Sequence, residues 1–294
     1  MIVIESASVT DRGKKRKTNE DALILEDALG LYVVADGMGG HRAGEVASRL
    51  VVNTMGEYVK NSTGSSDRRQ AVEFDETLSH EANRVLNGIQ ISNQVVHEVS
   101  QDNHSYRGMG STVSAVYFTD STLIAANVGD SPIHLVRDKK IKLLSVPHTF
   151  LAEQKSINPE NARKLGREFR HVLTRAVGTE RSVKADVCEI QCFRDDIIII
   201  SSDGLNDKVS PQELLEIVRN ITPQAACQNL VDLANDRGGD DNITVIVLHV
   251  KMVKNSQRKI NRLLALIKRN SVRILTGAKY SIQLISQRVR KCQT

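Results

Sequence analysis

Four aspartates stand at the ends of short apolar runs, and this pattern constrains the fold more than any other feature of the chain. They are Asp36 in VVADGMGG, Asp130 in NVGDS, Asp203 in IIIISSDGL and Asp241 in GGDDNIT. A short apolar run is typical of a buried strand, which fixes the direction of the residue that follows it. If these strand ends converge, the carboxylates form a site for a hard cation such as Mg²⁺ or Mn²⁺.

Strand and helix patterns occur in blocks along the chain. Strands are predicted at 1–10, 22–27, 30–37, 108–118, 121–130, 131–144, 184–193, 195–204 and 242–250. Helices are predicted at 41–60, 73–100, from 158–159 onward, at 210–218 and at 222–236, with residues 147–180 otherwise irregular. Because the strands do not alternate one by one with helices, we expect an α+β fold of mostly antiparallel sheets covered by helices.

Composition excludes several classes of protein. Aromatic residues make up 3% and tryptophan is absent, which argues against a nucleic-acid surface built on stacked bases. No apolar run reaches the roughly 18 residues of a membrane span. The first apolar run precedes the first basic run, the wrong order for a signal peptide, so a cytoplasmic protein is predicted. The four cysteines form no CxxC pair and are interpreted as reduced thiols: Cys188, Cys192, Cys227 and Cys292.

Charge divides the chain into two parts. Residues 251–294 hold twelve Lys/Arg and no Asp/Glu, so the preceding residues carry a net charge of −7 beneath the overall +5. We therefore expect a folded domain at 1–250 and a basic extension at 251–294. Within the extension Ile260, Leu263, Leu264 and Ile267 form an apolar stripe at helical spacing. The extension is interpreted as a packed helix or solvated tail, as a peripheral membrane helix, or as a docking segment for an acidic protein.

Seven segments in order carry a resemblance to a known family. They are RKTNEDA (16–22), VVADGMGGHRAGEVAS (33–48), GMGSTVSAV (108–116), NVGDSPIHLVR (127–137), LTRAVGTE (173–180), SSDGL (201–205) and GGDDNITVIVL (238–248). A single DG pair is more often a turn than a ligand, but the ordered set is specific. With these segments the chain resembles the PPM family, the type 2C metal-dependent protein phosphatases, in its compact bacterial form.

The resemblance implies a fold and an activity. The fold is a four-layer α/β/β/α sandwich of two antiparallel sheets flanked by helix pairs, with metals at one sheet edge. The activity is hydrolysis of phosphoserine and phosphothreonine on proteins by attack of a metal-bridged water, opposing a bacterial Ser/Thr kinase. The cofactors are two Mn²⁺ or Mg²⁺ ions, with a weaker third ion in bacterial members.

The metal ligands follow by position. Asp36 resembles the carboxylate that bridges the two ions, and Gly37 the residue that offers its carbonyl to one of them. Asp203 and Asp241 resemble the remaining carboxylate ligands. Asp130 matches the position that, with Asp203, helps to hold the third ion.

The resemblance also assigns residues around the metals. Glu20, Asp21 and Asn242 resemble residues that act on metal-bound waters. Arg16 resembles the arginine that grips the substrate phosphate, a role that suits a planar, always-charged guanidinium. His134, His148, His171 and His249 show no ligand spacing and are interpreted as structural or exposed.

Some positions depart from the family pattern. Met38 stands where many eukaryotic members have a histidine that can protonate the leaving oxygen, and His41 belongs to the bacterial GMGGH form. The general acid is therefore not identified. Pro132 replaces the arginine usual after GDS, and Pro147 the aspartate usual before the flap. Two other functions remain as alternatives: a catalytically weak phosphoprotein-binding module, and a scaffold that acts through its basic tail.

Overall fold

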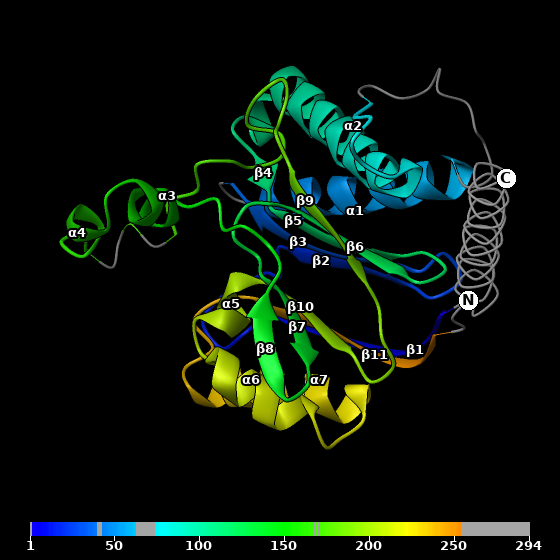
Figure 1. Cartoon of the computed structure of the whole chain (residues 1–294). Coiled ribbons are helices and arrows are strands. Elements are labelled where there is room, and N and C mark those ends of the chain that lie inside the picture. The colour runs from blue at the N-terminus through cyan, green and yellow to red at the C-terminus, as the bar shows by residue number, and fades with distance from the viewer. Residues whose placement is uncertain (1, 40–42, 63–73, 167–168, 170, 254–294) are drawn as a thin grey trace, which may run out of the picture. The chain divides into compact units, whose positions relative to one another are not determined.

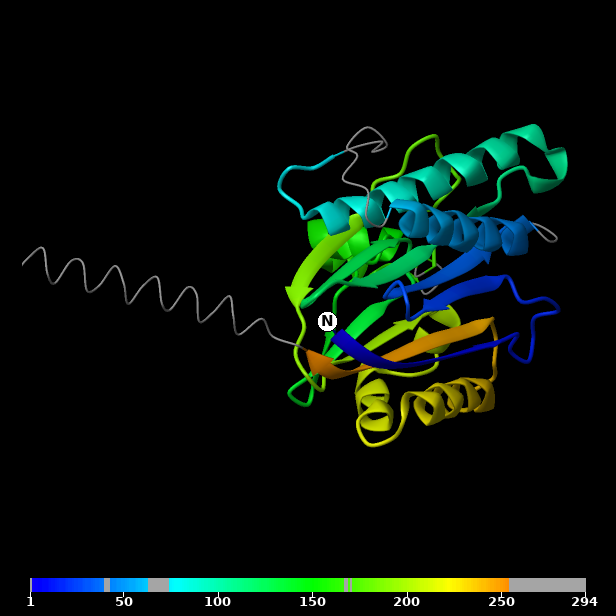
Figure 2. The same cartoon turned by 90° about the vertical axis from the view of Figure 1, so that its right-hand side faces the viewer.

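Two antiparallel β-sheets form the centre of the fold (Figures 1 and 2). The computed structural model describes residues 2–39, 43–62, 74–166, 169 and 171–253. The first sheet has the strand order β1 (Ile2–Asp11), β11 (Ile243–Val253), β10 (Ile197–Ser201), β7 (Ile133–Arg137) and β8 (Lys140–Leu143). The second sheet has the order β2 (Asp21–Glu26), β3 (Leu31–Met38), β5 (Val113–Phe118), β6 (Thr122–Val128) and β9 (Asp186–Gln191), and the short β4 (Gly110–Ser111) pairs with β3.

Helices cover the outer face of each sheet. The long helices α1 (Ala43–Ser62) and α2 (His80–Asp102) lie on the second sheet, above it in Figure 1. The helices α5 (Asp203–Asn206), α6 (Pro211–Val218) and α7 (Pro223–Asp236) lie on the first sheet, below it in Figure 1. A single turn of 3₁₀ helix, His104–Tyr106, follows α2. This arrangement confirms the predicted four-layer sandwich.

Alternation along the strands explains the layers. In β3, Val33 and Ala35 pack in the apolar cluster shared with α1 and α2. Their neighbours Tyr32 and Val34 pack in the cluster between the two sheets. Successive strand residues point to opposite faces, so a strand that is apolar throughout is buried on both sides.

Helix ends follow the capping signals in the sequence. Ser210 and Glu213 form the predicted capping box at the start of α6, with Pro211 in the first turn. Helix α2 begins at His80, later than the predicted 73, because the Ser79 hydroxyl accepts a hydrogen bond from the Ala82 N–H at 3.0 Å and so caps the helix there.

The structure corrects the prediction for residues 147–180, which gave only one helix. The expected helix is α4 (Pro159–Ala162), but α3 (Phe150–Ile157) precedes it, capped by the Thr149 hydroxyl. In Figure 1 both helices lie to the side of the two sheets. We call Pro147 to Arg175, which carries α3 and α4, the flap segment.

The remaining predictions concern membrane-spanning helices, the cysteines and the C-terminal extension. No helix in the described ranges is long and apolar enough to cross a membrane. Cys188, Cys192 and Cys227 are free thiols, and Cys292 lies outside the described residues. Strand β11 continues to Val253, past the predicted boundary at 250. The proposed amphipathic stripe in the extension also lies outside the described residues, so the division of the chain stays a prediction.

Candidate metal centre

The four aspartates of the sequence pattern converge at one end of the two sheets. Asp36 lies near the end of β3, and Asp203 begins α5 directly after β10. Asp130 lies between β6 and β7, and Asp241 precedes β11. All four line one cleft of about 830 Å³. Asp21 is buried in β2 directly opposite Asp36, so a fifth carboxylate belongs to the same group.

The segment at Ser111 and Thr112 holds the main chain of Asp36 in place. Its N–H donates to the Thr112 hydroxyl at 3.0 Å, and its carbonyl accepts from the Thr112 N–H at 2.8 Å and the Ser111 hydroxyl at 3.0 Å. A side chain on Gly37 would overlap the backbone of Gly44, at the start of α1. Only glycine permits this close approach of strand and helix. Hydrogen bonds and this close approach therefore fix the backbone at Asp36 and Gly37.

Burial, and after it repulsion between neighbouring carboxylates, raises the pKa of three aspartates in this group. Burial, followed by repulsion from Asp21 and Asp203, raises the pKa of Asp36 well above its ordinary value. Burial also raises the pKa of Asp21 to about 7, although Ser202 donates a hydrogen bond to it at 2.8 Å. The pKa of Asp130 rises to about 7, first through burial and then through repulsion by Asp203. The cleft thus concentrates more negative charge than its surroundings neutralise.

The donor atoms fit hard divalent cations. Asp21 Oδ1 and Asp203 Oδ1 are buried and have no hydrogen-bond partner within the described ranges. A buried carboxylate oxygen without a partner is costly, and a cation removes that cost. The aspartates supply oxygen ligands, which Mn²⁺ and Mg²⁺ accept.

The residues predicted around the metals lie at the cleft or beside it. Arg16 and Glu20 line the cleft, and Arg16 Nη2 donates to Asp241 Oδ2 at 2.6 Å. The Asn242 Oδ1 atom accepts a hydrogen bond from the Glu20 N–H at 2.8 Å. Its Nδ2 atom donates hydrogen bonds to the carbonyls of Arg12 and Thr18, each at 2.9 Å. Asn242 therefore fixes the loop that carries Arg16 and Glu20.

His171 belongs to the site, although no ligand spacing marks it in the sequence. Its Nδ1 lies 3.3 Å from Asp203 Oδ2 and its Nε2 lies 3.2 Å from Asp207 Oδ2. Donor atoms of Asp130, His171 and Asp203 all lie within 4.8 Å of one another. The hydrogen bond to Asp203 raises the pKa of His171 to about 9. Asp207 follows Asp203 by one helical turn, so the two carboxylates lie on the same side of the chain. This spacing was the available sequence signal for a cationic partner at that place.

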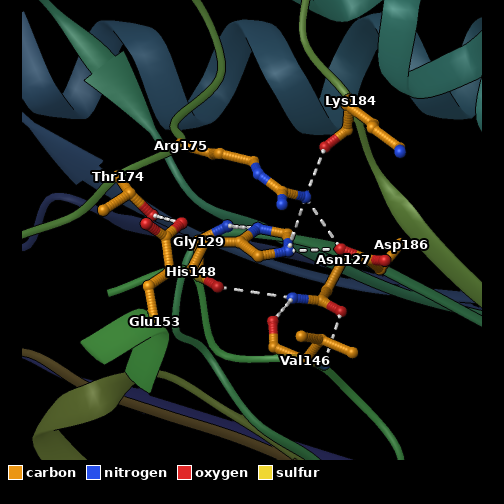
Figure 3. A network of polar contacts seen from close by, with 9 residues as sticks. All are labelled: Asn127, Gly129, Val146, His148, Glu153, Thr174, Arg175, Lys184 and Asp186. Atoms are coloured by element: carbon orange, nitrogen blue, oxygen red, sulfur yellow. Dashed lines mark hydrogen bonds and ion pairs between the residues drawn. The ribbon is translucent and has the colours of Figure 1, made fainter. Parts of the chain in front are cut away.

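A buried histidine joins the flap segment to the metal centre (Figure 3). The Gly129 N–H donates to His148 Nδ1 at 3.0 Å, so the proton is on Nε2, which donates to Asp186 Oδ2 at 2.6 Å. Arg175 donates to the same Asp186 oxygen at 2.8 Å. The His148 main chain donates to the Gly129 carbonyl at 3.0 Å and accepts from the Thr174 N–H at 2.9 Å. His148 thus ties the start of the flap segment to Gly129, the residue before Asp130, and Thr174 ties its end to His148.

No general acid is apparent from the described residues that depart from the family pattern. Met38 lines the cleft and brings no ionisable group. His41 lies outside the described residues. Pro132 and Pro147 both line a second cleft, beside the first. These two prolines therefore bear on the surroundings of the centre and not on its ligands.

Comparisons with known proteins agree with this geometry. The family model for protein phosphatase 2C matches residues 11–235. A putative protein phosphatase 2C-type of Streptococcus pyogenes is 35% identical over 248 residues, covering 82% of this chain and 95% of that protein. The crystal structure of the serine/threonine phosphatase PstP/Ppp of Mycobacterium tuberculosis matches with a TM-score of 0.74 and 28% identity, covering 85% of this chain and all of that one. A structure of the PstP catalytic domain with two manganese ions has a TM-score of 0.71 and 26% identity. The match covers 86% of this chain and 100% of that chain.

Proposed function

Because this chain belongs to the protein phosphatase 2C family, we infer that it is a metal-dependent protein serine/threonine phosphatase acting on phosphoserine and phosphothreonine. The convergence of Asp36, Asp130, Asp203 and Asp241 on one cleft is the observation that carries this function. A phosphomonoester needs charge stabilisation and an aimed water for its hydrolysis, and such a site supplies both without a covalent nucleophile.

We propose a role for each ligand. Asp36, Asp203, Asp241 and the Gly37 carbonyl would hold two ions, Mn²⁺ or Mg²⁺, and Asp36 would be the ligand shared by both. Asp130, with Asp203, would hold a weaker third ion. When bound, the ions supply an activated water and polarise the phosphoryl oxygens.

Three residues act on water and on the loop around the ions. Glu20, Asp21 and Asn242 orient water in the cleft. Two observations support this role. Glu20 and Asn242 line the cleft, and Asp21 lies opposite Asp36 in the pairing of β2 with β3. The bonds of Asn242 to the Arg12 and Thr18 carbonyls hold the loop in place while the substrate binds.

A direct test separates this function from its alternatives. The full chain is incubated with a phosphothreonine peptide, in Mn²⁺ and after exhaustive chelation. Turnover that appears only with Mn²⁺ supports the enzyme. Binding of the peptide without turnover would instead favour a phosphoprotein-binding module. A scaffold acting through its tail would neither turn the peptide over nor bind it.

Arg16→Ala is expected to reduce kcat/KM on a phosphopeptide by about tenfold, the size of one lost charge-assisted hydrogen bond. Mn²⁺ affinity should be kept, because the change leaves Asp241 available to an ion. Steady-state kinetics and Mn²⁺ titration measure the two effects. The loss appears in KM alone if the contact is equal in ground and transition states.

Lys14→Ala is the matched control for Arg16→Ala. Lys14 lies in the same basic loop but pairs with Asp236 at 3.6 Å and does not line the cleft. It should keep the kcat/KM of the parent chain. An Arg16→Ala variant that also keeps it would refute the phosphate-binding role.

We propose that the enzyme works in the cytoplasm against a cognate Ser/Thr kinase and that kinase's substrates. The basic extension brings it to an anionic membrane surface or to an acidic protein. The twelve Lys/Arg of residues 251–294, with no Asp/Glu among them, support this role. No nucleic-acid partner is proposed.

Deletion of residues 254–294 is expected to leave turnover of para-nitrophenyl phosphate within about twofold. The cut follows Val253, because β11 pairs with β1 up to that residue. Tm should shift by less than about 2 °C, under roughly 1 kcal/mol for a domain of this size. Co-sedimentation with anionic liposomes at low salt should be lost, since this attraction is electrostatic and is screened by salt.

Two results would contradict the roles given to the extension. A much lower Tm and lost activity would make it a structural part of the catalytic domain. If neither form sediments with anionic liposomes, the membrane surface is excluded and only an acidic protein remains.

A further inference from the structure

A second cleft, of about 730 Å³, adjoins the metal centre. Asp130, His171, Asp203 and Asp207 line both clefts, so the two are continuous. The proposed function places a phosphorylated side chain at the metals. The polypeptide on one side of that residue can therefore run directly into the second cleft, which we call the flap cleft.

Apolar side chains line a large part of the flap cleft. They come from the β7–β8 hairpin, the flap segment and the start of α6: Pro132, Ile141, Leu143, Pro147, Leu151 and Pro211. Leu143 is 40% exposed, although it lies in a concave surface. It belongs to β8, the edge strand of the first sheet. Exposed apolar surface in a cleft favours a ligand that buries an apolar group against it.

The flap cleft also has an uncharged polar side chain in its lining. His134 is 4% exposed, and its Nδ1 has no hydrogen-bond partner within the part of the chain that the structure describes. Burial lowers the pKa of His134 to about 4, so the ring is neutral at physiological pH. The surface around His134 therefore carries no charge, which suits an uncharged side chain of a ligand.

Charged side chains of both signs also line the flap cleft. Asp130, Asp203 and Asp207 lie where it meets the metal centre. Lys155, on α3 of the flap segment, also lines the flap cleft and is positively charged. A ligand with an acidic group at Lys155 therefore complements the flap side of the cleft, whereas a basic group there is repelled.

We propose that the flap cleft binds the segment of a substrate phosphoprotein adjoining the phosphorylated residue, with an apolar side chain against Leu143 and an acidic side chain at Lys155. The proposal rests on the phosphatase function and names the sequence around the phosphosite that this chain prefers. Leu143 and Lys155 then act in substrate selection and not in the chemical step.

Peptides with a central phosphothreonine test the proposal. One series places Leu or Ser at each flanking position in turn, and a second places Glu or Lys. The full chain with Mn²⁺ should show a higher kcat/KM for Leu over Ser and for Glu over Lys, on one side of the phosphothreonine. Para-nitrophenyl phosphate, which has no flanking residues, reports on the metal centre alone.

Lys155→Glu is the decisive variant. It should lower the ratio of kcat/KM for the Glu peptide to kcat/KM for the Lys peptide by at least about fivefold. The variant loses the partly exposed ion pair of Lys155 with the peptide Glu and gains a repulsion in its place. Leu143→Ser should remove the preference for Leu. Both variants should turn over para-nitrophenyl phosphate within about twofold of the parent chain, because neither residue is a proposed metal ligand.

Lys140→Glu is the matched control, an exposed lysine of β8 outside the flap-cleft lining. It should leave both preferences unchanged. The proposal is overturned if Lys155→Glu shifts the ratio no more than Lys140→Glu, or if it lowers turnover of every substrate equally. Failure of the phosphatase function itself would look different, since the parent chain with Mn²⁺ would then hydrolyse no substrate.

Discussion

Asp36→Asn is expected to lower kcat by at least about a hundredfold, equivalent to roughly 2.7 kcal/mol of transition-state stabilisation. The amide removes a negative charge and one anionic ligand from the position that is proposed to be shared by the two ions. The main-chain bonds of Asp36 to Thr112 do not involve the changed atoms, so the strand should stay in place. Phosphopeptide turnover at saturating Mn²⁺ measures the loss.

The same substitution should stabilise the metal-free protein. Burial and repulsion by Asp21 and Asp203 raise the pKa of Asp36, which means that its charged form is unfavourable in the fold. Asparagine removes that charge, so Tm in chelator should rise while activity falls. Asp232→Asn, on the outer helix α7, is the control and should change neither quantity. Activity within about threefold of the parent chain would exclude Asp36 as the bridging ligand.

Removal of metal is expected to abolish turnover and to make stability strongly dependent on pH. In the metal-free protein the pKa values of Asp21 and Asp130 are about 7. Both lie above the ordinary value of about 3.9. The stability linked to these groups is therefore complete below about pH 4 and is lost as the pH rises through about 7. The metal-free protein should accordingly unfold at a lower temperature at pH 8 than at pH 5.

Mn²⁺ should reverse this loss, because it binds the ionised carboxylates. The Tm gain on adding Mn²⁺ should be at least about 5 °C larger at pH 8 than at pH 5, or roughly 1–2 kcal/mol for a domain of this size. Calorimetry in chelator and in Mn²⁺ measures it, and NaCl at matched ionic strength controls for screening. An equal gain at both pH values would show that these carboxylates do not compete for protons and metal.

Much of the fold could be predicted because its local signals agree with one another. The run that ends at Asp36 is apolar at every position, and β3 is buried on both faces. Ser210 and Glu213 marked the start of α6 by their spacing alone. The four aspartates marked the metal centre because a strand end limits where a side chain can point. Each of these signals lies within about ten residues of sequence.

The features that the sequence did not predict depend on contacts between distant residues. Helix α3 has eight residues and none of them is buried, so no apolar stripe marks it. His171 acquires its role only from the flap segment, which brings it to Asp203. His148 and Asp186 are 38 positions apart, and nothing near either residue indicates their hydrogen bond. The roles of such residues can be recognised only in the folded structure, because the contacts that define them join distant parts of the chain.

The position of the carboxylates has a consequence for the integrity of the sandwich. Asp21 and Asp36 belong to the second sheet, whereas Asp203 and Asp241 flank strands of the first. Ions held by these carboxylates would therefore link the two layers, in addition to the apolar packing between the sheets and the Ser202–Asp21 hydrogen bond. Without ions, like charges face each other across the same seam. A substitution that weakens metal binding would then loosen this edge of the molecule as well as slow catalysis, so both properties depend on the same few side chains.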